Sequence, residues 1–321
     1  MRKLLRTGRR LTNTGRPIVL MYPRVAKLTA DPWRLAVTPD HFARQIEILK
    51  RERDIVPMVR LTKEMREGRL SRNTAAVTFD DGYADVFHNA VPVLVHHSCP
   101  ATVFVTSQPI VDQRGFWWDI LCRILMETAI LPEHLSIAIA GERLEWHLGD
   151  GGSQTLTGES RDALHVALHA MLKPMDPLRR QAFLECLAAW AGTEAGSRLS
   201  DRAMTADELR QLATIKGIEI GAHTLTHPSL PLISLEEAVR EVAESRRQCE
   251  VMSGQPVTGF AYPFGDHDDA SVQAVNASGL HYAVTTVQRE IGPRTDPFRI
   301  PRILVADWDE ADFQRMVLSH G

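Results

Sequence analysis

Apolar runs typical of buried strands alternate with helix-like segments along most of this sequence, and this alternation limits the fold more than any other feature. The β-prone runs lie at residues 17–22, 54–58, 75–79, 101–105, 218–222, 259–262, 282–285 and 302–305. Helix starts are marked by Pro39 after Thr38 and by capping boxes that begin at Thr205 and Ser234. Strands and helices that alternate over short connections predict an α/β fold with a parallel sheet and right-handed crossovers, most simply a barrel.

The alternation changes between about residues 113 and 200. Here we expect an aromatic-headed helix at 116–126, a short β-like patch around 135–146, a Gly-rich turn at 149–152, and amphipathic helices at 161–172 and 177–191. We interpret this stretch as a mostly helical insertion in a strand-to-helix loop. The expected organisation is a basic N-terminal arm at residues 1–16, followed by a single barrel domain at 17–321 that carries the insertion.

The length and composition are those of an ordinary globular chain. With 321 residues and 44% hydrophobic content, it can bury a full core. The net charge of -3 gives no electrostatic reason to expect a nucleic acid or an acidic membrane as a partner. The four cysteines lie far apart without a C-x-x-C spacing, which is typical of reduced thiols in a cytoplasmic protein. Nothing in the composition predicts an oligomeric state.

The N-terminal segment is rich in Lys and Arg, but no apolar segment follows it. Residues 11–16 are polar, so the pattern is not that of a signal peptide, and no later stretch has the length and hydropathy of a transmembrane segment. Peripheral contact of the basic arm with anionic lipid headgroups is one interpretation, and a solvated tail is the other. The sequence therefore predicts a cytoplasmic protein.

Two adjacent carboxylates, Asp80 and Asp81, follow the apolar run at 75–79, and Gly82 ends that run. A strand would deliver both side chains to its C-terminal end, and a turn at the second residue can bring them to the same side. Carboxylates this close repel each other unless a cation lies between them or they have different functions. The alternative is an Asx-type turn without a chemical role.

Two histidines four residues apart, His223 and His227, follow the run at 218–222. Side chains with this spacing can reach one metal ion from a single turn, although an isolated H-x-x-x-H pattern more often consists of ordinary surface or hydrogen-bonded residues. In a parallel barrel, polar residues at the carboxyl ends of the strands meet at one face. One carboxylate with two imidazoles is a suitable three-ligand set for a catalytic divalent metal.

Two aromatic groups have an open interpretation. The strand end Phe260-Ala-Tyr-Pro-Phe-Gly265 predicts a fixed turn whose backbone N–H groups face the site, with an aromatic turn of the core as the alternative. Near the start of the insertion, Trp118 and Asp119 could contact a sugar, or the tryptophans could anchor the insertion to the barrel.

These three motifs together resemble the polysaccharide deacetylase family, which includes chitooligosaccharide, peptidoglycan and biofilm-polymer deacetylases. The resemblance rests on Thr78-Phe-Asp-Asp-Gly82 followed by His223-Thr-Leu-Thr-His227, and it covers most of the chain outside the insertion. It implies a distorted (β/α) barrel and a divalent metal, usually zinc, with nickel or cobalt as alternatives. It also implies Asp80 as the general base and a set of metal ligands consisting of Asp81, His223 and His227.

The resemblance extends to the chemistry of the site. The metal would acidify a bound water and polarise the acyl oxygen, while Asp80 takes the proton of the water. The backbone N–H of Phe264 is the expected oxyanion donor. Arg24 and Arg302 can hold substrate oxygens or form structural ion pairs. The expected substrate contacts are Tyr262, Pro263, Trp118, Asp119 and Arg302.

The sequence departs from the family pattern at three positions. Ala261-Tyr-Pro-Phe264 replaces a motif in which an arginine often positions the catalytic aspartate, so that support is missing or comes from elsewhere. The stretch at 298–304 lacks a histidine that often acts as general acid, and Pro23 stands where relatives commonly have a histidine. The general acid is therefore unassigned. His267 is a nearby candidate whose alternative is a solvated loop residue, and Asp80 could return its own proton.

The expected function is metal-dependent removal of an N-acyl group, most simply acetyl, from an amino sugar. The sugar could be free, nucleotide-linked, lipid-linked or part of an oligosaccharide, and cytoplasmic placement favours a biosynthetic intermediate of a cell-surface polysaccharide or glycoconjugate. A deformylase of a lipid-linked formamido sugar would use the same site. The alternative from another class is a catalytically weak family member that binds a glycan, which is motivated by Pro23 and the missing histidine.

Overall fold

The computed structural model describes residues 15–113, 115–139, 142–148 and 160–319. The Gly-rich turn expected at 149–152, and all but the last two residues of the basic arm expected at 1–16, lie outside the described residues. Within the described ranges, none of the helices has both the length and the apolar character needed to cross a bilayer.

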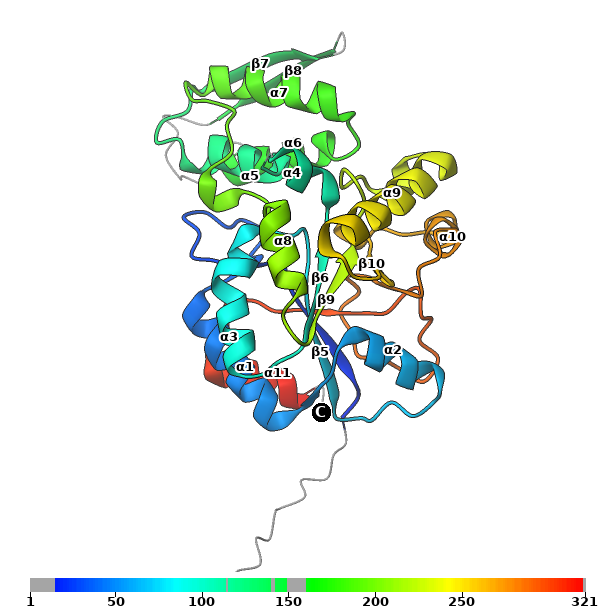
Figure 1. The fold of residues 1–321 in the computed structure, drawn as a ribbon. Coiled ribbons are helices and arrows are strands. Elements are labelled where there is room, and N and C mark those ends of the chain that lie inside the picture. The colour runs from blue at the N-terminus through cyan, green and yellow to red at the C-terminus, as the bar shows by residue number, and fades with distance from the viewer. Residues whose placement is uncertain (1–14, 114, 140–141, 149–159, 320–321) are drawn as a thin grey trace, which may run out of the picture.

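A parallel sheet occupies the centre of the barrel (Figure 1). Its strands are β1 (Ile18–Tyr22), β4 (Asp54–Ile55), β5 (Thr74–Phe79), β6 (Ala101–Val105), β9 (Ile218–Ala222), β10 (Gly259–Ala261), β11 (Tyr282–Val284) and β12 (Ile303–Leu304). They follow the order β11-β10-β9-β6-β5-β1-β12, and β4 also pairs with β5. An isolated parallel bridge between Val284 and Ile300 links β11 toward the start of β12. This open, curved arrangement confirms the predicted distorted (β/α) barrel.

The strands form where the sequence is continuously apolar. Every residue of β1, β5 and β6 is buried, which is typical of parallel strands that are covered on both faces. The surrounding helices are α1 (Pro39–Glu52), α2 (Met58–Arg66), α3 (Val91–His96), α8 (Ala206–Ala213), α9 (Leu235–Ser253), α10 (Asp269–Ala277) and α11 (Glu310–Ser319). In Figure 1, α1, α3 and α11 gather on one side of the sheet, whereas α9 and α10 lie on the other.

The structure confirms all three predicted helix starts, and two of them have a side-chain cap. Thr205 and Ser234 each form both hydrogen bonds of a capping box, at the N-termini of α8 and α9. Thr38 precedes α1, but its hydroxyl donates to Asp307 instead of capping the helix. Thr38 therefore occupies the predicted N-cap position with Pro39 after it, but it provides no side-chain cap because a distant carboxylate accepts from its hydroxyl.

Two further segments differ from the expectation. The run at 54–58 pairs as a strand only at Asp54 and Ile55, and α2 begins at Met58 after Pro57. The helix expected at 86–97 starts as a π-helical turn before α3 begins. Pro92 lies at the junction, and it has no N–H to continue the regular hydrogen-bond ladder.

The chain between β6 and β9 forms a group of elements that Figure 1 shows as a lobe above the barrel. It contains α4 (Ser107–Asp112), α5 (Trp117–Cys122), the antiparallel hairpin of β7 (His134–Ile139) and β8 (Glu142–His147), α6 (Arg161–Leu172) and α7 (Pro177–Trp190). Apart from α4, whose Ile110 packs in the core of the barrel, these elements share a hydrophobic cluster that includes Leu121, Leu135, Leu168 and Leu184. The lobe therefore has its own packed interior beside the core of the barrel.

Shortening Leu184 to alanine is expected to destabilise the protein by about 2–5 kcal/mol, because Leu184 is 1% exposed within the cluster of the lobe. Leu178 lies on the same helix but is 80% exposed, so Leu178→Ala is expected to change the free energy of unfolding by less than about 0.5 kcal/mol. Urea denaturation of both variants measures the difference. Equal losses in the two variants would contradict the described packing of α7.

Candidate active site

Three of the predicted motifs meet at the carboxyl ends of neighbouring strands. Asp80 and Asp81 follow β5, and His223 and His227 follow β9, which is separated from β5 by β6 alone. The turn that contains Phe264 follows β10, the neighbour of β9 on the other side. The structure therefore brings together side chains that are far apart in the sequence.

Left-handed backbone conformations are concentrated around these strand ends. Asp81, Thr224, His227 and Phe264 have φ values of 66°, 65°, 63° and 60°. Such conformations are costly for residues other than glycine and persist where the surrounding structure requires them, often at functional sites. At Asp81, this turn directs the second carboxylate away from the path of the strand, as the sequence predicts.

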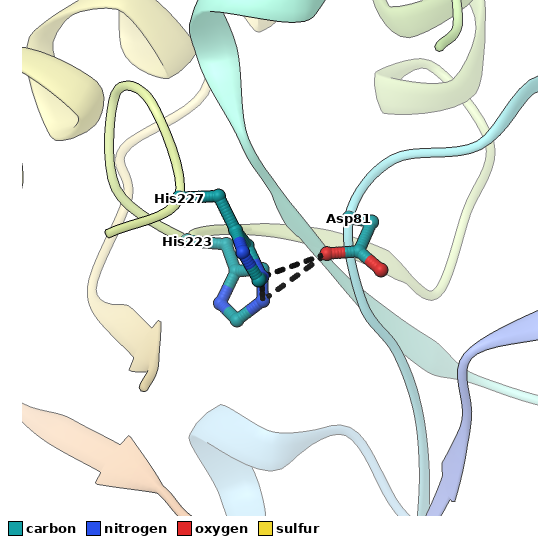
Figure 2. Close-up of side chains that lie close together, drawn as sticks. All are labelled: Asp81, His223 and His227. Atoms are coloured by element: carbon teal, nitrogen blue, oxygen red, sulfur yellow. Dashed lines mark hydrogen bonds and ion pairs between the residues drawn. The ribbon is translucent and has the colours of Figure 1, made fainter. Parts of the chain in front are cut away.

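Asp81, His223 and His227 form a compact donor set (Figure 2). Asp81 Oδ1 lies 3.3 Å from His223 Nε2 and 3.2 Å from His227 Nε2, and the two Nε2 atoms are 3.2 Å apart. Ligands at about 2.0–2.1 Å from a tetrahedral zinc ion are roughly 3.3 Å from one another. The three donor atoms thus have the mutual spacing of one face of a zinc coordination tetrahedron.

The hydrogen bonding of this donor set also fits a cation. His223 Nδ1 lies 2.7 Å from the carbonyl oxygen of Ala261, which can only accept, so Nδ1 carries the proton and Nε2 of the neutral ring has a lone pair. Asp81 Oδ1 is buried without a hydrogen-bond partner among the described residues. Because three acceptor atoms converge here, Asp81, His223 and His227 could together hold a divalent cation.

The residues of the donor set shift one another's pKa values. Burial by itself would raise the pKa of Asp81, but the close imidazoles of His223 and His227 outweigh it and hold this pKa well below its usual range. Burial lowers the pKa of His227, and Asp81 only partly offsets this effect. The carboxylate is therefore ionised and His227 favours the neutral form, which are the states that bind a metal. At His223, burial lowers the pKa but the contact with Asp81 outweighs it and raises this pKa, so a cation would bind there by displacing a proton.

Asp80 has a different partner, Arg302. The guanidinium of Arg302 donates from Nη1 to Oδ1 at 2.7 Å and from Nη2 to Oδ2 at 2.6 Å, and Nη1 also reaches the hydroxyl of Thr78 at 3.2 Å. Bidentate pairing of this kind fixes the plane of a carboxylate. Arg302 thus supplies the positioning arginine that is missing from the stretch at 261–264.

The expected role of Arg302 in substrate binding is not supported by this geometry. Arg302 is completely buried, and its Nε donates to the carbonyl oxygen of Thr285 at 2.9 Å. Its charged end is occupied by Asp80 and Thr78. Arg302 therefore lies behind the general-base candidate and does not line the cavity.

A cavity of about 390 Å³ opens onto Asp80 and the donor set. Its wall also includes Pro23, which places this residue where a side chain could have served as a proton donor. Other lining residues are Trp33, Trp118, His169, Tyr262 and Phe264. His267, the acid candidate from the sequence, lines a neighbouring groove instead, and its Nδ1 lies 2.8 Å from the carbonyl oxygen of Gly265.

Of the expected contacts in the turn after β10, Tyr262 and Phe264 line the cavity and Pro263 does not. Tyr262 lines the cavity, but its hydroxyl donates to the carbonyl oxygen of Phe298 at 3.0 Å. Pro263 is buried within the turn and is not part of the cavity wall, so its expected contact with substrate is not supported. The ring of Phe264 packs on His227 with centroids 4.6 Å apart. The backbone N–H of Phe264 remains a predicted oxyanion donor.

Trp118 and Asp119 belong to a buried network beside the site. Trp118 lines the cavity and packs on His227, while its Nε1 donates to the hydroxyl of Tyr83 at 2.7 Å. That hydroxyl donates to Asp119 at 2.7 Å, and Asp119 also faces Arg24. Burial raises the pKa of Asp119 to about 7. Asp119 does not line the main cavity but an adjoining hollow of about 40 Å³ that shares Asp81 and Trp118 with it, and its contact with substrate stays a prediction.

Arg24 forms a structural ion-pair cluster within this network. It pairs with Asp85 at 2.8 Å and with Asp201 at 3.1 Å, and its guanidinium lies over the ring of Tyr83 at 4.2 Å. A buried guanidinium with these partners is satisfied within the protein. Arg24 thereby holds Tyr83, which in turn bonds Trp118 beside the metal donors.

Two lining residues, Trp33 and His169, were not predicted from the sequence. Trp33 lies in the loop between β2 (Arg24–Val25) and β3 (Ala36–Val37), and His169 lies on α6 of the lobe. Neither residue belongs to a local sequence motif. The amphipathic pattern of α6 predicted a helix around His169, but not that this side chain lines the cavity. Their place in the cavity depends on the packing of the lobe against the barrel.

Replacement of His223 by alanine removes one of the three donors and is expected to lower zinc affinity more than about 100-fold. This loss exceeds the roughly 10–100-fold that follows when only a hydrogen-bond partner of a ligand is removed. His267→Ala is the matched control, since this ring stacks on Tyr262 outside the donor set. Zinc content after dialysis, measured by mass spectrometry, compares the two variants. Retention of zinc by His223→Ala would contradict the assigned donor set.

Comparison with known proteins agrees with this geometry. The family model for polysaccharide deacetylase matches residues 67–134 and 187–283, which excludes β7, β8 and α6. The poly-beta-1,6-N-acetyl-D-glucosamine N-deacetylase of Staphylococcus epidermidis is 21% identical over 290 residues, covering 87% of this chain and 74% of that protein.

Solved structures show the same fold. The Streptococcus pyogenes deacetylase PplD, solved in complex with acetate, has a TM-score of 0.62 at 15% identity, with 94% of this chain and 97% of that chain covered. IcaB from Ammonifex degensii has a TM-score of 0.60 at 14% identity, with coverages of 95% and 97%. Because the family model spans both the β5 motif and the β9 motif, the chain belongs to the polysaccharide deacetylase family.

Proposed function

We propose that this protein is a metal-dependent N-deacetylase that removes an acetyl group from an amino sugar during synthesis of a cell-surface polysaccharide or glycoconjugate. The observation that carries the proposal is the pairing of two carboxylates with different partners in one cavity. Asp81 meets two imidazoles at 3.2 and 3.3 Å, whereas Asp80 is held by Arg302 and opens onto the same space. Such a pair supplies a metal ligand and a general base.

Asp81, His223 and His227 would hold the cation, and zinc suits their nitrogen and oxygen donors. A bound zinc ion supplies Lewis acidity, which lowers the pKa of a water and polarises an acyl oxygen. Asp80 removes a proton from the attacking water, and Arg302 keeps both oxygens of Asp80 in a fixed plane. Oxygen from water bonds to the acyl carbon, the C–N bond breaks, and the products are acetate and a free amine.

The departing nitrogen needs a proton, and Asp80 is our proposed donor. Asp80 carries the proton taken from water and faces the cavity, so it can return this proton to the amine. Pro23 cannot do so because its side chain has no exchangeable proton. His267 lies outside the cavity wall. One carboxyl group thus acts first as base and then as acid.

The release of acetate and of formate from N-acylated amino sugars and their oligosaccharides tests the proposal. Wild-type protein loaded with zinc is expected to release acetate and to stop after chelation. Asp80→Asn is expected to reduce turnover by roughly 10²–10⁴-fold, since an amide cannot accept the proton, while zinc remains bound. Quantification of both acids also tests a deformylase, which would use the same site on a formamido sugar.

The panel separates catalysis from glycan binding as well. Pro23 in the cavity wall is the observation that favours a family member that binds a glycan without turning it over. That alternative predicts sugar binding with equal, negligible release by wild type and Asp80→Asn. Equal release by the two proteins, in the presence of bound zinc, would overturn the proposed role of Asp80.

A further inference from the structure

One wall of the active-site cavity comes from α6, a helix of the lobe that lies outside the match to the family model. Helix α6 places His165, His169 and Lys173 at successive spacings of four residues, with Lys173 just after its last residue. Side chains with this spacing lie along one face of a helix. The adjacent face, with Leu164, Leu168 and Leu172, packs into the interior of the lobe. The polar stripe of α6 is thus directed toward the barrel.

Lys173 connects this stripe to the turn after β10 through an ion pair and a cation–π contact. Its ammonium group lies 2.5 Å from Asp266 Oδ2 and 4.3 Å from the centre of the Phe264 ring. Asp266 also accepts from the hydroxyl of Ser229 at 2.6 Å. An ammonium that is shared between a carboxylate and an aromatic face is well fixed. The position of α6 relative to Phe264 and the metal donors is therefore determined.

Trp33 faces the stripe from a loop of the barrel. Asp31 accepts hydrogen bonds from the backbone N–H groups of Leu35 and Ala36 at 2.9 and 2.8 Å, which closes the loop around Trp33. The centroid of the Trp33 ring is 5.0 Å from that of His169, and both residues line the cavity. The Trp33 ring also packs on the buried His165, with centroids 5.6 Å apart, and Trp33 is nevertheless 41% exposed, so part of the indole is accessible from the cavity.

His169 is well suited to bond a neutral polar group. Burial lowers its pKa to about 4, and the nearby charges of His165 and Lys173 act in the same direction. The neutral ring has one donor and one acceptor nitrogen, and no side-chain hydrogen bond of His169 is found among the described residues. A hydroxyl group, which both donates and accepts, matches this pair.

We propose that Trp33 and His169 form a sugar-binding subsite of the cavity, in which the indole lies against a pyranose ring and the imidazole bonds a sugar hydroxyl. An indole offers a flat apolar surface to the C–H face of a sugar, and a neutral imidazole can hydrogen-bond the hydroxyl groups at the edge of the sugar ring. This inference rests on the proposed function. The subsite combines a loop of the barrel with a helix of the lobe, and both lie outside the match to the family model.

Steady-state kinetics of Trp33→Ala and His169→Ala test the subsite, with N-acetylated trisaccharides of glucosamine, β-1,4- and β-1,6-linked, as probes. Loss of a stacking or hydrogen-bonding contact to the sugar is expected to raise KM roughly 5–10-fold and to leave kcat within about 3-fold. Trp33→Phe, which keeps an aromatic face, is expected to restore most of the affinity. His147→Ala is the matched control, since His147 is an exposed residue on β8 of the same lobe.

The contrary results are distinct. An unchanged KM in His169→Ala and Trp33→Ala would overturn the subsite, and so would a fall in kcat alone, which would instead assign His169 to proton transfer. Titration calorimetry with the same probes, on zinc-loaded protein, covers the case in which wild type releases no acid. Binding that is weakened by Trp33→Ala but not by His147→Ala would then retain the subsite while the proposed function fails. No binding of either probe would overturn both.

Discussion

Two carboxylates that are adjacent in sequence and buried at one strand end repel each other when both are ionised, so each needs its own partners. Asp80 has Arg302, which bonds both of its oxygens. Asp81 turns away through a left-handed backbone and meets His223 and His227. This separation leaves one carboxylate with the imidazoles and the other facing the cavity, as the proposed division between a metal ligand and a general base requires. The rest of the site is arranged around it.

The sheet order explains how distant segments supply these partners. β12 pairs with β1, which in turn pairs with β5, so Arg302 at the start of β12 reaches across one strand to Asp80. Thr78 of β5 also links these strands, since its hydroxyl donates to the carbonyl oxygen of Leu20 on β1 and accepts from Arg302. On the opposite side, β9 and β10 bring the histidines and Phe264. The lobe then closes the cavity with His169.

Features encoded by neighbouring residues could be predicted from the sequence, whereas those that depend on long-range packing could not. The strand that delivers Asp80, the His223–His227 spacing and both capping boxes are local patterns, and the structure has them. The pair between Arg302 and Asp80 joins residues 222 positions apart, so a substrate contact and an ion pair were equally compatible with the sequence. Trp33 and His169 have no motif, and only the docking of α6 brings them together.

The most direct test of this division between the carboxylates is the zinc content and acetate release of Arg302→Lys, measured on the same preparation. Lysine keeps the positive charge but bonds as a point donor, so it cannot hold both oxygens of Asp80. We expect zinc to be retained as in wild type, while turnover falls about 10- to 100-fold because Asp80 loses its fixed orientation. Loss of zinc, or turnover equal to that of wild type, would contradict the separate roles of Asp80 and Asp81.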